Sequence, residues 1–179
     1  MVSPKRSGHS RAKLLIASLA AVLLLATANE SSGATASTTM TVSVTVASTC
    51  TVSANPLSFG TYLPGQGSMS ASTTLAVLCT KGAPFTVALN AGTGGGSVTQ
   101  RSMRMGTNTL AYNLYTTATH TTVWGDGTQR SATVSGIGRG LTSGAAIRQT
   151  VYGQVPDAAA NADLAPGLYT DLVTVTVSY

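Results

Sequence analysis

Cys50 and Cys79 are the residues of this 179-residue chain whose type is best suited to covalent chemistry. Two thiols either oxidise to a disulfide or, with further ligands, hold a metal ion. A metal site lacks ligands, because the chain has no other cysteine and, apart from His9, His120 is its only histidine. We therefore expect no metal, and we expect one Cys50–Cys79 disulfide if the chain is exported to an oxidising compartment.

Catalysis by an acid, a base or an activated nucleophile requires several such groups to converge, and few are present. His120 stands in a threonine-rich stretch with no cysteine or carboxylate beside it, which predicts a solvated loop residue. The acidic residues beyond residue 36 fall at predicted turns and strand starts, where an aspartate bonds its own backbone; they are Asp126, Asp157, Asp163 and Asp171. The sequence therefore predicts neither an enzyme nor a cofactor site.

Two glycine-rich runs, 92–96 and 136–140, have only a superficial likeness to nucleotide-binding loops. The first lacks the Gly-Lys-Ser/Thr ending of a phosphate loop, and the second has Leu141 where a dinucleotide fingerprint requires its third glycine. Neither run precedes a predicted helix. We interpret both as flexible hairpin tips.

The amino-terminal segment has the layout of a secretory signal peptide, with a basic start, an apolar run over residues 14–28 and then small polar residues. This run of 15 residues is shorter than the about 20 that a membrane-spanning helix needs, so a membrane anchor is the less favoured alternative. Ala-x-Ala signals place cleavage after Ala28 or Ala36. We therefore expect residues 1–36 to be a signal peptide and the chain to be exported.

Charge is scarce in this chain. Ten Lys and Arg against five Asp and Glu give a net charge of +5, yet charged residues make up only 8% of the sequence, against about 25% in an average soluble domain. Beyond residue 36, six basic and four acidic residues remain, and the basic ones are scattered. A scattered set is a poor footprint for a polyanion, so we expect no nucleic-acid partner.

Beyond residue 40 the sequence alternates apolar and small polar residues with a period of two, and it shows no extended helical spacing. This pattern, interrupted by turns that contain glycine or proline, predicts a single all-β domain with the architecture of a β-sandwich. The clearest predicted strands span residues 40–47, 73–79, 85–90, 109–115, 147–155 and 169–179.

The first and the last of these strands each carry an apolar stripe, which must be buried somewhere. On the first strand the stripe consists of Met40, Val42, Val44 and Val46. On the last strand it consists of Val173, Val175, Val177 and Tyr179. The simplest interpretation from the pattern alone is that both strands pair within the chain's own sandwich.

A series of short motifs covers the chain from residue 48 onward. They are STCTV at 48–52, LSFG at 57–60, LC at 78–79, FTVAL at 85–89, LAYNLY at 110–115, WGDGT at 124–128, YGQV at 152–155 and PGLYTDLVTVTV at 166–177. In this order and spacing the chain resembles the spore coat protein U domain family, which includes the major pilins of archaic (Csu-type) chaperone-usher pili.

The resemblance implies an incomplete immunoglobulin-like β-sandwich that lacks its last strand and is completed by a donated one. Residues 37–47 would be an amino-terminal donor strand, whose plugs are Met40, Val42, Val44 and Val46, and residues 48–179 would be the pilin domain. In the periplasm a chaperone would donate the missing strand and hold the strand that borders the groove, at Val173, Val175, Val177 and Tyr179. An outer-membrane usher would then assemble identical or related subunits head to tail.

Such a subunit would end in a pilus on the cell surface, where it would support attachment and biofilm formation. Two alternatives remain open at this point. One is a spore or cell coat protein. The other is a monomeric secreted binding module, similar to a lectin, that uses Tyr112, Tyr115 and Trp124 as a stacking surface for sugars.

Overall fold

The computed structural model describes residues 33–179. Within this range the chain forms eight strands and two short 3-10 helices, η1 (Ser143–Ala145) and η2 (Ala159–Asn161), and no α-helix. The strands are β1 (Cys50–Ala54), β2 (Met69–Cys79), β3 (Pro84–Leu89), β4 (Arg101–Met105), β5 (Asn108–Tyr115), β6 (Val134–Ile137), β7 (Ile147–Val155) and β8 (Val175–Ser178).

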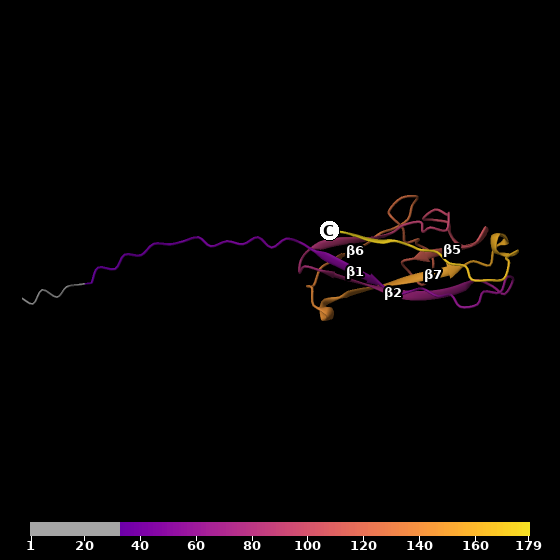
Figure 1. Ribbon diagram of the computed structural model, residues 1–179, viewed down its shortest axis with the longest axis horizontal. Coiled ribbons are helices and arrows are strands. Elements are labelled where there is room, and N and C mark those ends of the chain that lie inside the picture. The colour runs from indigo at the N-terminus through magenta and orange to yellow at the C-terminus, as the bar shows by residue number, and fades with distance from the viewer. Residues whose placement is uncertain (1–32) are drawn as a thin grey trace, which may run out of the picture. The chain divides into compact units, whose positions relative to one another are not determined.

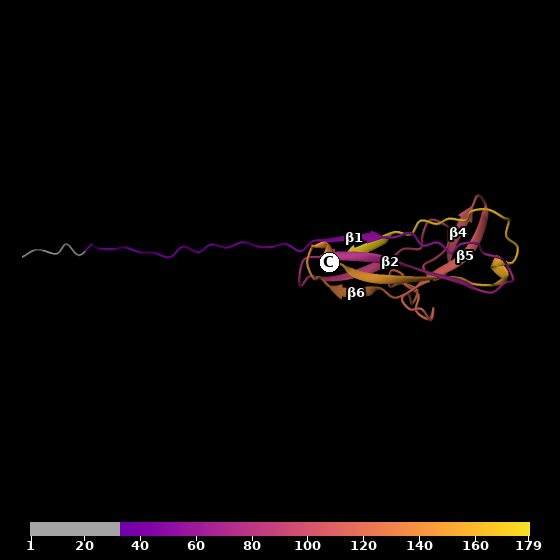
Figure 2. The same cartoon turned by 90° about the horizontal axis from the view of Figure 1, so that it is seen from below.

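The strands form two antiparallel sheets. One sheet has the order β1-β2-β7-β5-β4 and the other has the order β6-β3-β8. The longest pairing joins β2 to β7, from Met69 opposite Val155 to Val77 opposite Ile147. Both views show β1 and β8, which belong to different sheets, running close to one another at one end of the sandwich (Figures 1 and 2). The predicted all-β sandwich is confirmed.

The core lies between the two sheets and follows from the period of two in the strands. Along β3, Phe85, Val87 and Leu89 are buried, while the residues between them are partly exposed. The inner face of β2 contributes Leu75 and Val77 in the same way. Other buried core side chains come from the end of β2, from β5, from β7 and from the 123–132 segment: Cys79, Leu110, Tyr112, Leu114, Trp124, Val151 and Val155.

The predicted strands at 73–79, 85–90, 109–115 and 147–155 correspond to β2, β3, β5 and β7. Three short strands, β1, β4 and β6, were not predicted. β4 has the sequence RSMRM and β6 has the sequence VSGI. Neither contains the run of β-branched and aromatic residues that indicates a strand, and pairing with a long neighbour holds each of them in the sheet.

The last predicted strand, 169–179, is too long. Only β8, residues 175–178, is a strand, and Thr170 makes an isolated bridge to Arg104 in the other sheet. The carboxyl-terminal segment therefore crosses from one sheet to the other, which interrupts its pairing between residues 171 and 173; at Thr174 the carbonyl already accepts the N–H of Asn90.

The predicted strand at 40–47 is absent as well, because residues 33–49 carry no helix or strand and neither sheet includes a residue before Cys50. A strand has no internal hydrogen bonds, so a segment without a partner cannot form one. The interpretation that this strand pairs within the chain's own sandwich is therefore wrong for this structure. The signal peptide prediction lies outside the described residues, except for residues 33–36.

Candidate functional site: an open apolar groove

An apolar groove of about 900 Å³ runs along the sandwich. One of its walls is the segment 54–64, which starts at the last residue of β1, and the other includes residues 164–171. Its floor is the sandwich core itself, from β2, β3, β5 and β7: Leu75, Leu89, Leu110, Tyr112, Leu114, Val151 and Val155. The groove thus lies directly over side chains of the shared core, each of which is at most 6% exposed.

The carboxyl-terminal segment borders this groove. Val173 and Val175 line it and are only partly buried against the core. Val177 is also partly buried, whereas Tyr179 is 60% exposed, and neither of these two lines the groove. Of the four residues predicted to border a groove, the structure therefore places two in its lining.

β8 has an unpaired backbone edge. It lies at the border of the three-stranded sheet and pairs with β3 from Thr86 opposite Ser178 to Leu89 opposite Val175. Within residues 33–179 no strand pairs with its other edge. Exposed N–H and C=O groups of this kind form a template for pairing with another strand.

Asp171 anchors the crossing segment at the side of the groove. Its Oδ1 accepts hydrogen bonds from the backbone N–H of Thr93 (2.7 Å) and of Gly94 (2.8 Å), and its Oδ2 accepts one from the hydroxyl of Tyr112 (2.6 Å). Burial, together with the bond to Asp171, raises the pKa of Tyr112 above its ordinary value. Asp171 is the one charged residue in the groove lining, and these donors occupy its carboxylate.

The acidic residues were predicted to bond their own local backbone. Asp126 does so, since it accepts hydrogen bonds from the N–H and the hydroxyl of Thr128. Asp157 instead binds the N–H groups of Gly65 and Gly67, far away in sequence. These distant contacts were missed because nothing in the local sequence marks them.

Arg101 is a buried residue that no local sequence pattern singles out. Its side chain is fully buried, and its guanidinium donates to the side-chain oxygen of Asn113 at 2.7 Å and to the carbonyl of Trp124 at 2.9 Å. It also donates to the carbonyls of Leu89, Asn90 and Val98. Burial lowers its pKa from the ordinary value. The guanidinium therefore ties the end of β3 to β5 and to the Trp124 segment.

The two glycine-rich runs are tightly packed rather than flexible tips. A Cβ at Gly94 would overlap the carbonyl oxygen of Ser102, and one at Gly92 would overlap the Asp171 carboxylate. In the second run, a Cβ at Gly136 would collide with the ring of Phe85. These glycines are explained by the close approach of other groups, which the sequence pattern does not reveal.

The residues predicted to be donor plugs are fully accessible. The exposed fractions are 83% for Met40, 82% for Val42, 89% for Val44 and 77% for Val46. Burial of each of these apolar side chains would lower the free energy. The segment carries no charge between residues 37 and 47.

The aromatic residues considered as a sugar-stacking surface do not form one. Trp124 is 1% exposed and donates its indole N–H to the carbonyl of Val87, and Tyr112 is also buried. Tyr115 is half-buried with its ring edge-on to that of His120. His120, predicted to be solvated, is therefore partly covered by this contact.

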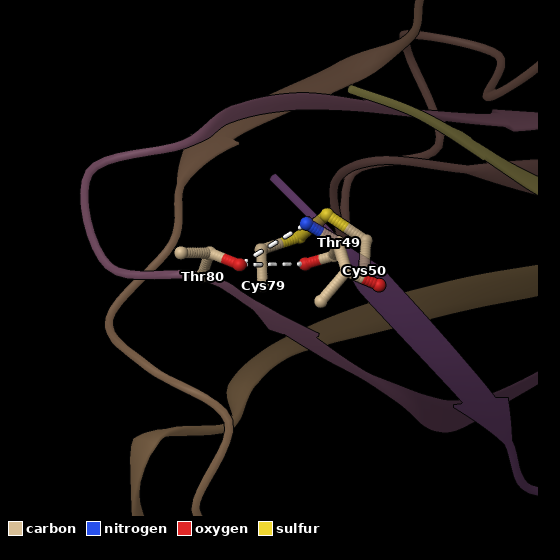
Figure 3. Close-up of a disulfide and its surroundings, with 4 residues drawn as sticks. All are labelled: Thr49, Cys50, Cys79 and Thr80. Atoms are coloured by element: carbon tan, nitrogen blue, oxygen red, sulfur yellow. Dashed lines mark hydrogen bonds between the residues drawn. A yellow bond between two sulfur atoms is a disulfide. The ribbon is translucent and has the colours of Figure 1, made fainter. Parts of the chain in front are cut away.

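The predicted disulfide is confirmed. Cys50, the first residue of β1, lies directly opposite Cys79, the last residue of β2, and the two are bonded (Figure 3). The neighbouring pair, Thr49 and Thr80, continues the connection: the N–H of Thr80 donates to the carbonyl of Thr49 at 3.0 Å, and the N–H of Thr49 donates to the hydroxyl of Thr80 at 3.1 Å. The start of β1 is thus fixed to the end of β2.

In residues 33–179, no group of three or more His, Cys, Asp or Glu side chains is arranged to hold a metal ion. The same part of the chain contains no helix that is long and apolar enough to span a membrane.

The fold and the groove define an all-β sandwich with an apolar groove over its core and one unpaired strand edge at the border of that groove. Residues 36–176 match the model of the Spore Coat Protein U domain family, and the chain belongs to this family. A search of the curated proteins finds no match.

Among the solved structures, the chain is similar to one in the crystal structure of the CsuC-CsuE chaperone-tip adhesion subunit pre-assembly complex from archaic chaperone-usher Csu pili of Acinetobacter baumannii. The identity is 22% and the TM-score is 0.51. The match covers 75% of this chain and 41% of that one, so this chain spans less than half of that protein. At this identity the likeness supports the fold.

Proposed function

We propose that this protein is a structural subunit of a surface pilus, exported by its signal peptide and polymerised by donor-strand complementation. The observation that carries the proposal is the groove: an apolar channel over the sandwich core, bordered by the unpaired edge of β8. A small apolar ligand would cover the side chains but not the backbone groups. A donated strand covers both, which is the β-augmentation mode of recognition.

The donated strand is residues 37–47 of a neighbouring subunit, and the acceptor is the pilin domain, residues 48–179. Met40, Val42, Val44 and Val46 alternate in sequence, so they project from one face of an extended strand. Burying four side chains of this size contributes about 6 to 12 kcal/mol before ordering costs. The donor segment carries no charge, and the single carboxylate in the groove, that of Asp171, is already hydrogen-bonded. An uncharged donor therefore suits this groove.

Donor and acceptor are different surfaces of the same chain, so the contact is head to tail and continues into a filament. Before assembly the open groove requires protection. A periplasmic chaperone supplies a strand in transit and holds the strand that contains Val173, Val175, Val177 and Tyr179. An outer-membrane usher then exports the growing polymer, which serves attachment and biofilm formation. The crystallised chaperone–subunit complex with a similar fold is consistent with this course.

The test is deletion of residues 37–47 from the chain expressed with its chaperone and usher. We expect a folded, chaperone-bound subunit that forms no polymer, whereas the intact chain gives polymers that resist dissociation in unheated detergent gels. The matched control replaces Thr41, Ser43 and Thr45 on the opposite face of the donor by alanine. This triple variant is expected to polymerise. Intact protein that stays monomeric beside its chaperone and usher would refute the proposal.

A further inference from the structure

The junction between the donor segment and β1 is held by an unusual arrangement at Thr80. In a continued antiparallel ladder, the N–H of Thr49 would donate to the carbonyl of Thr80. That carbonyl instead accepts the N–H of Ala83 at 3.0 Å, in the turn that follows β2. The side-chain hydroxyl of Thr80 takes its place and accepts the N–H of Thr49 at 3.1 Å.

The hydroxyl therefore extends the pairing of β1 by one residue after β2 has turned away. The same hydroxyl lies 3.3 Å from the carbonyl oxygen of Thr49, and the N–H of Thr80 donates to that carbonyl at 3.0 Å. The Cys50–Cys79 disulfide closes the next pair (Figure 3). Together these contacts form the exit clamp, which consists of Thr49, Cys50, Cys79 and Thr80.

The residues just before the exit clamp are not held by hydrogen bonds. Within the described part of the chain, residues 44–48 form no hydrogen bond and are exposed. The clamp thus holds Thr49 opposite Thr80, as one further pair of the β1–β2 ladder.

This pairing matters because the groove of the same subunit begins at Ala54, the last residue of β1, and continues along residues 55–64. To fill its own groove, the donor segment would have to reverse just before Thr49 and run antiparallel to β1. Such a reversal needs a tight turn, usually with Gly, Asn or Asp at positions of positive φ. The available residues are Ala47 and Ser48. With Thr49 clamped in line with β1, a reversal at these two residues is disfavoured.

We propose that the exit clamp prevents a subunit from filling its own groove, and that Thr80 is a positioning residue that favours insertion between subunits over insertion within one. This inference rests on the proposed function. It assigns to the Thr80 hydroxyl a role in the outcome of assembly in addition to its contribution to the fold.

The experiment compares Thr80→Val with Thr80→Ser in the full chain, exported with its chaperone and usher. Valine has the shape of threonine but cannot accept the hydrogen bond, and serine keeps the hydroxyl. The measured quantity is the fraction of chaperone-free monomer in which residues 37–47 resist proteinase K. Loss of one hydrogen bond is expected to raise this fraction about fivefold in Thr80→Val, while Thr80→Ser stays at the wild-type value.

A second variant tests the inference even if Thr80→Val does not fold. Insertion of Asn-Gly between Ala47 and Ser48 supplies the missing turn upstream of the clamp. It is expected to give protease-protected monomers in place of polymer. An Ala-Ala insertion at the same place adds equal length without a turn and is expected to polymerise.

The inference is overturned if Thr80→Val and Thr80→Ser give equal fractions of protected monomer, or if the Asn-Gly insertion polymerises as well as the Ala-Ala insertion. A purely structural role for Thr80 would lower the thermal midpoint without protecting residues 37–47. If the wild-type chain itself forms no polymer, the proposed function fails. The wild-type sample therefore distinguishes this failure from a failure of the inference about Thr80.

Discussion

Arg101 shows at the scale of one residue how a chain with little charge uses a cation inside its core. The guanidinium has no carboxylate partner among its hydrogen bonds, which go to backbone carbonyls and to Asn113. Such a charge is tolerated because each of these acceptors carries a partial negative charge. Sequence reasoning treated Arg101 as one of several scattered basic residues, because burial of an arginine depends on contacts that lie far apart in sequence.

Replacing Arg101 by methionine is expected to lower the free energy of unfolding by at least about 3 kcal/mol, because several buried carbonyls would lose their donor. Urea denaturation of the chaperone-free subunit measures this change. Arg148→Met is the matched control, since Arg148 lies exposed on β7 and its replacement is expected to change stability by less than about 0.5 kcal/mol. Equal effects of the two substitutions would contradict the assignment of Arg101.

Tyr112 makes the stability of the fold depend on pH in a direction that can be predicted. Its pKa is raised in the folded state by burial and by the bond to Asp171, so the folded state retains the proton when the unfolded state has lost it. The contribution to stability is fully present below the ordinary tyrosine pKa of about 10 and is lost as the pH rises above it.

Tyr112→Phe is therefore expected to be less stable than the wild type at pH 7, by about 1 to 2 kcal/mol for the lost hydrogen bond to a carboxylate. Its stability is also expected to fall less steeply between about pH 10 and 11.5. Thermal unfolding at a series of pH values measures both. An unchanged slope in the variant would show that Tyr112 is not the group responsible.

At the scale of elements, the strand predictions succeeded where the local pattern decides the structure. β2, β3, β5 and β7 follow from alternation alone, and the disulfide follows from export and the cysteine count. The groove walls at 54–64 and 164–171 could not be predicted, because they are irregular and are held by distant contacts such as those of Asp157 and Asp171. The alternation of residues 40–47 was visible, but a strand forms only when a partner is present.

The packed glycine loop provides an element-scale prediction. Gly94→Ala is expected to destabilise the subunit by about 1 to 3 kcal/mol, because the new methyl group would overlap the Ser102 carbonyl. Gly144→Ala, where nothing lies within 4 Å of the added carbon, is expected to be neutral or slightly stabilising. Differential scanning calorimetry compares them, and a neutral Gly94→Ala would show that the loop is loose.

The disulfide is the other element-scale device. Replacing both Cys50 and Cys79 by serine opens a loop with a sequence separation of 29 residues. We expect a loss of about 3.6 kcal/mol in the chain-entropy model. The measurement is the denaturation midpoint of the double variant against that of the wild type without reductant. A difference close to zero would mean that the sheet pairing alone fixes β1 to β2.

At the scale of the whole molecule, the scarcity of charge acquires a physical reason. Soluble proteins protect exposed strand edges with lysines and other charges. Here β8 has the sequence VTVS, and the donor segment is also uncharged. Charges at either place would obstruct the pairing of donor and acceptor, so the low charge suits a chain whose edges are covered by neighbours.

Amide hydrogen exchange of the assembled protein tests the central claim most directly, since it reports on residues 37–47 and on β8 in the same sample. The account predicts that both are protected in the polymer, with exchange at least about a thousandfold slower than in an unstructured segment. Both would lose this protection when the polymer is dissociated. Residues 37–47 that exchange at the unstructured rate, while residues 50–178 are protected, would contradict the account.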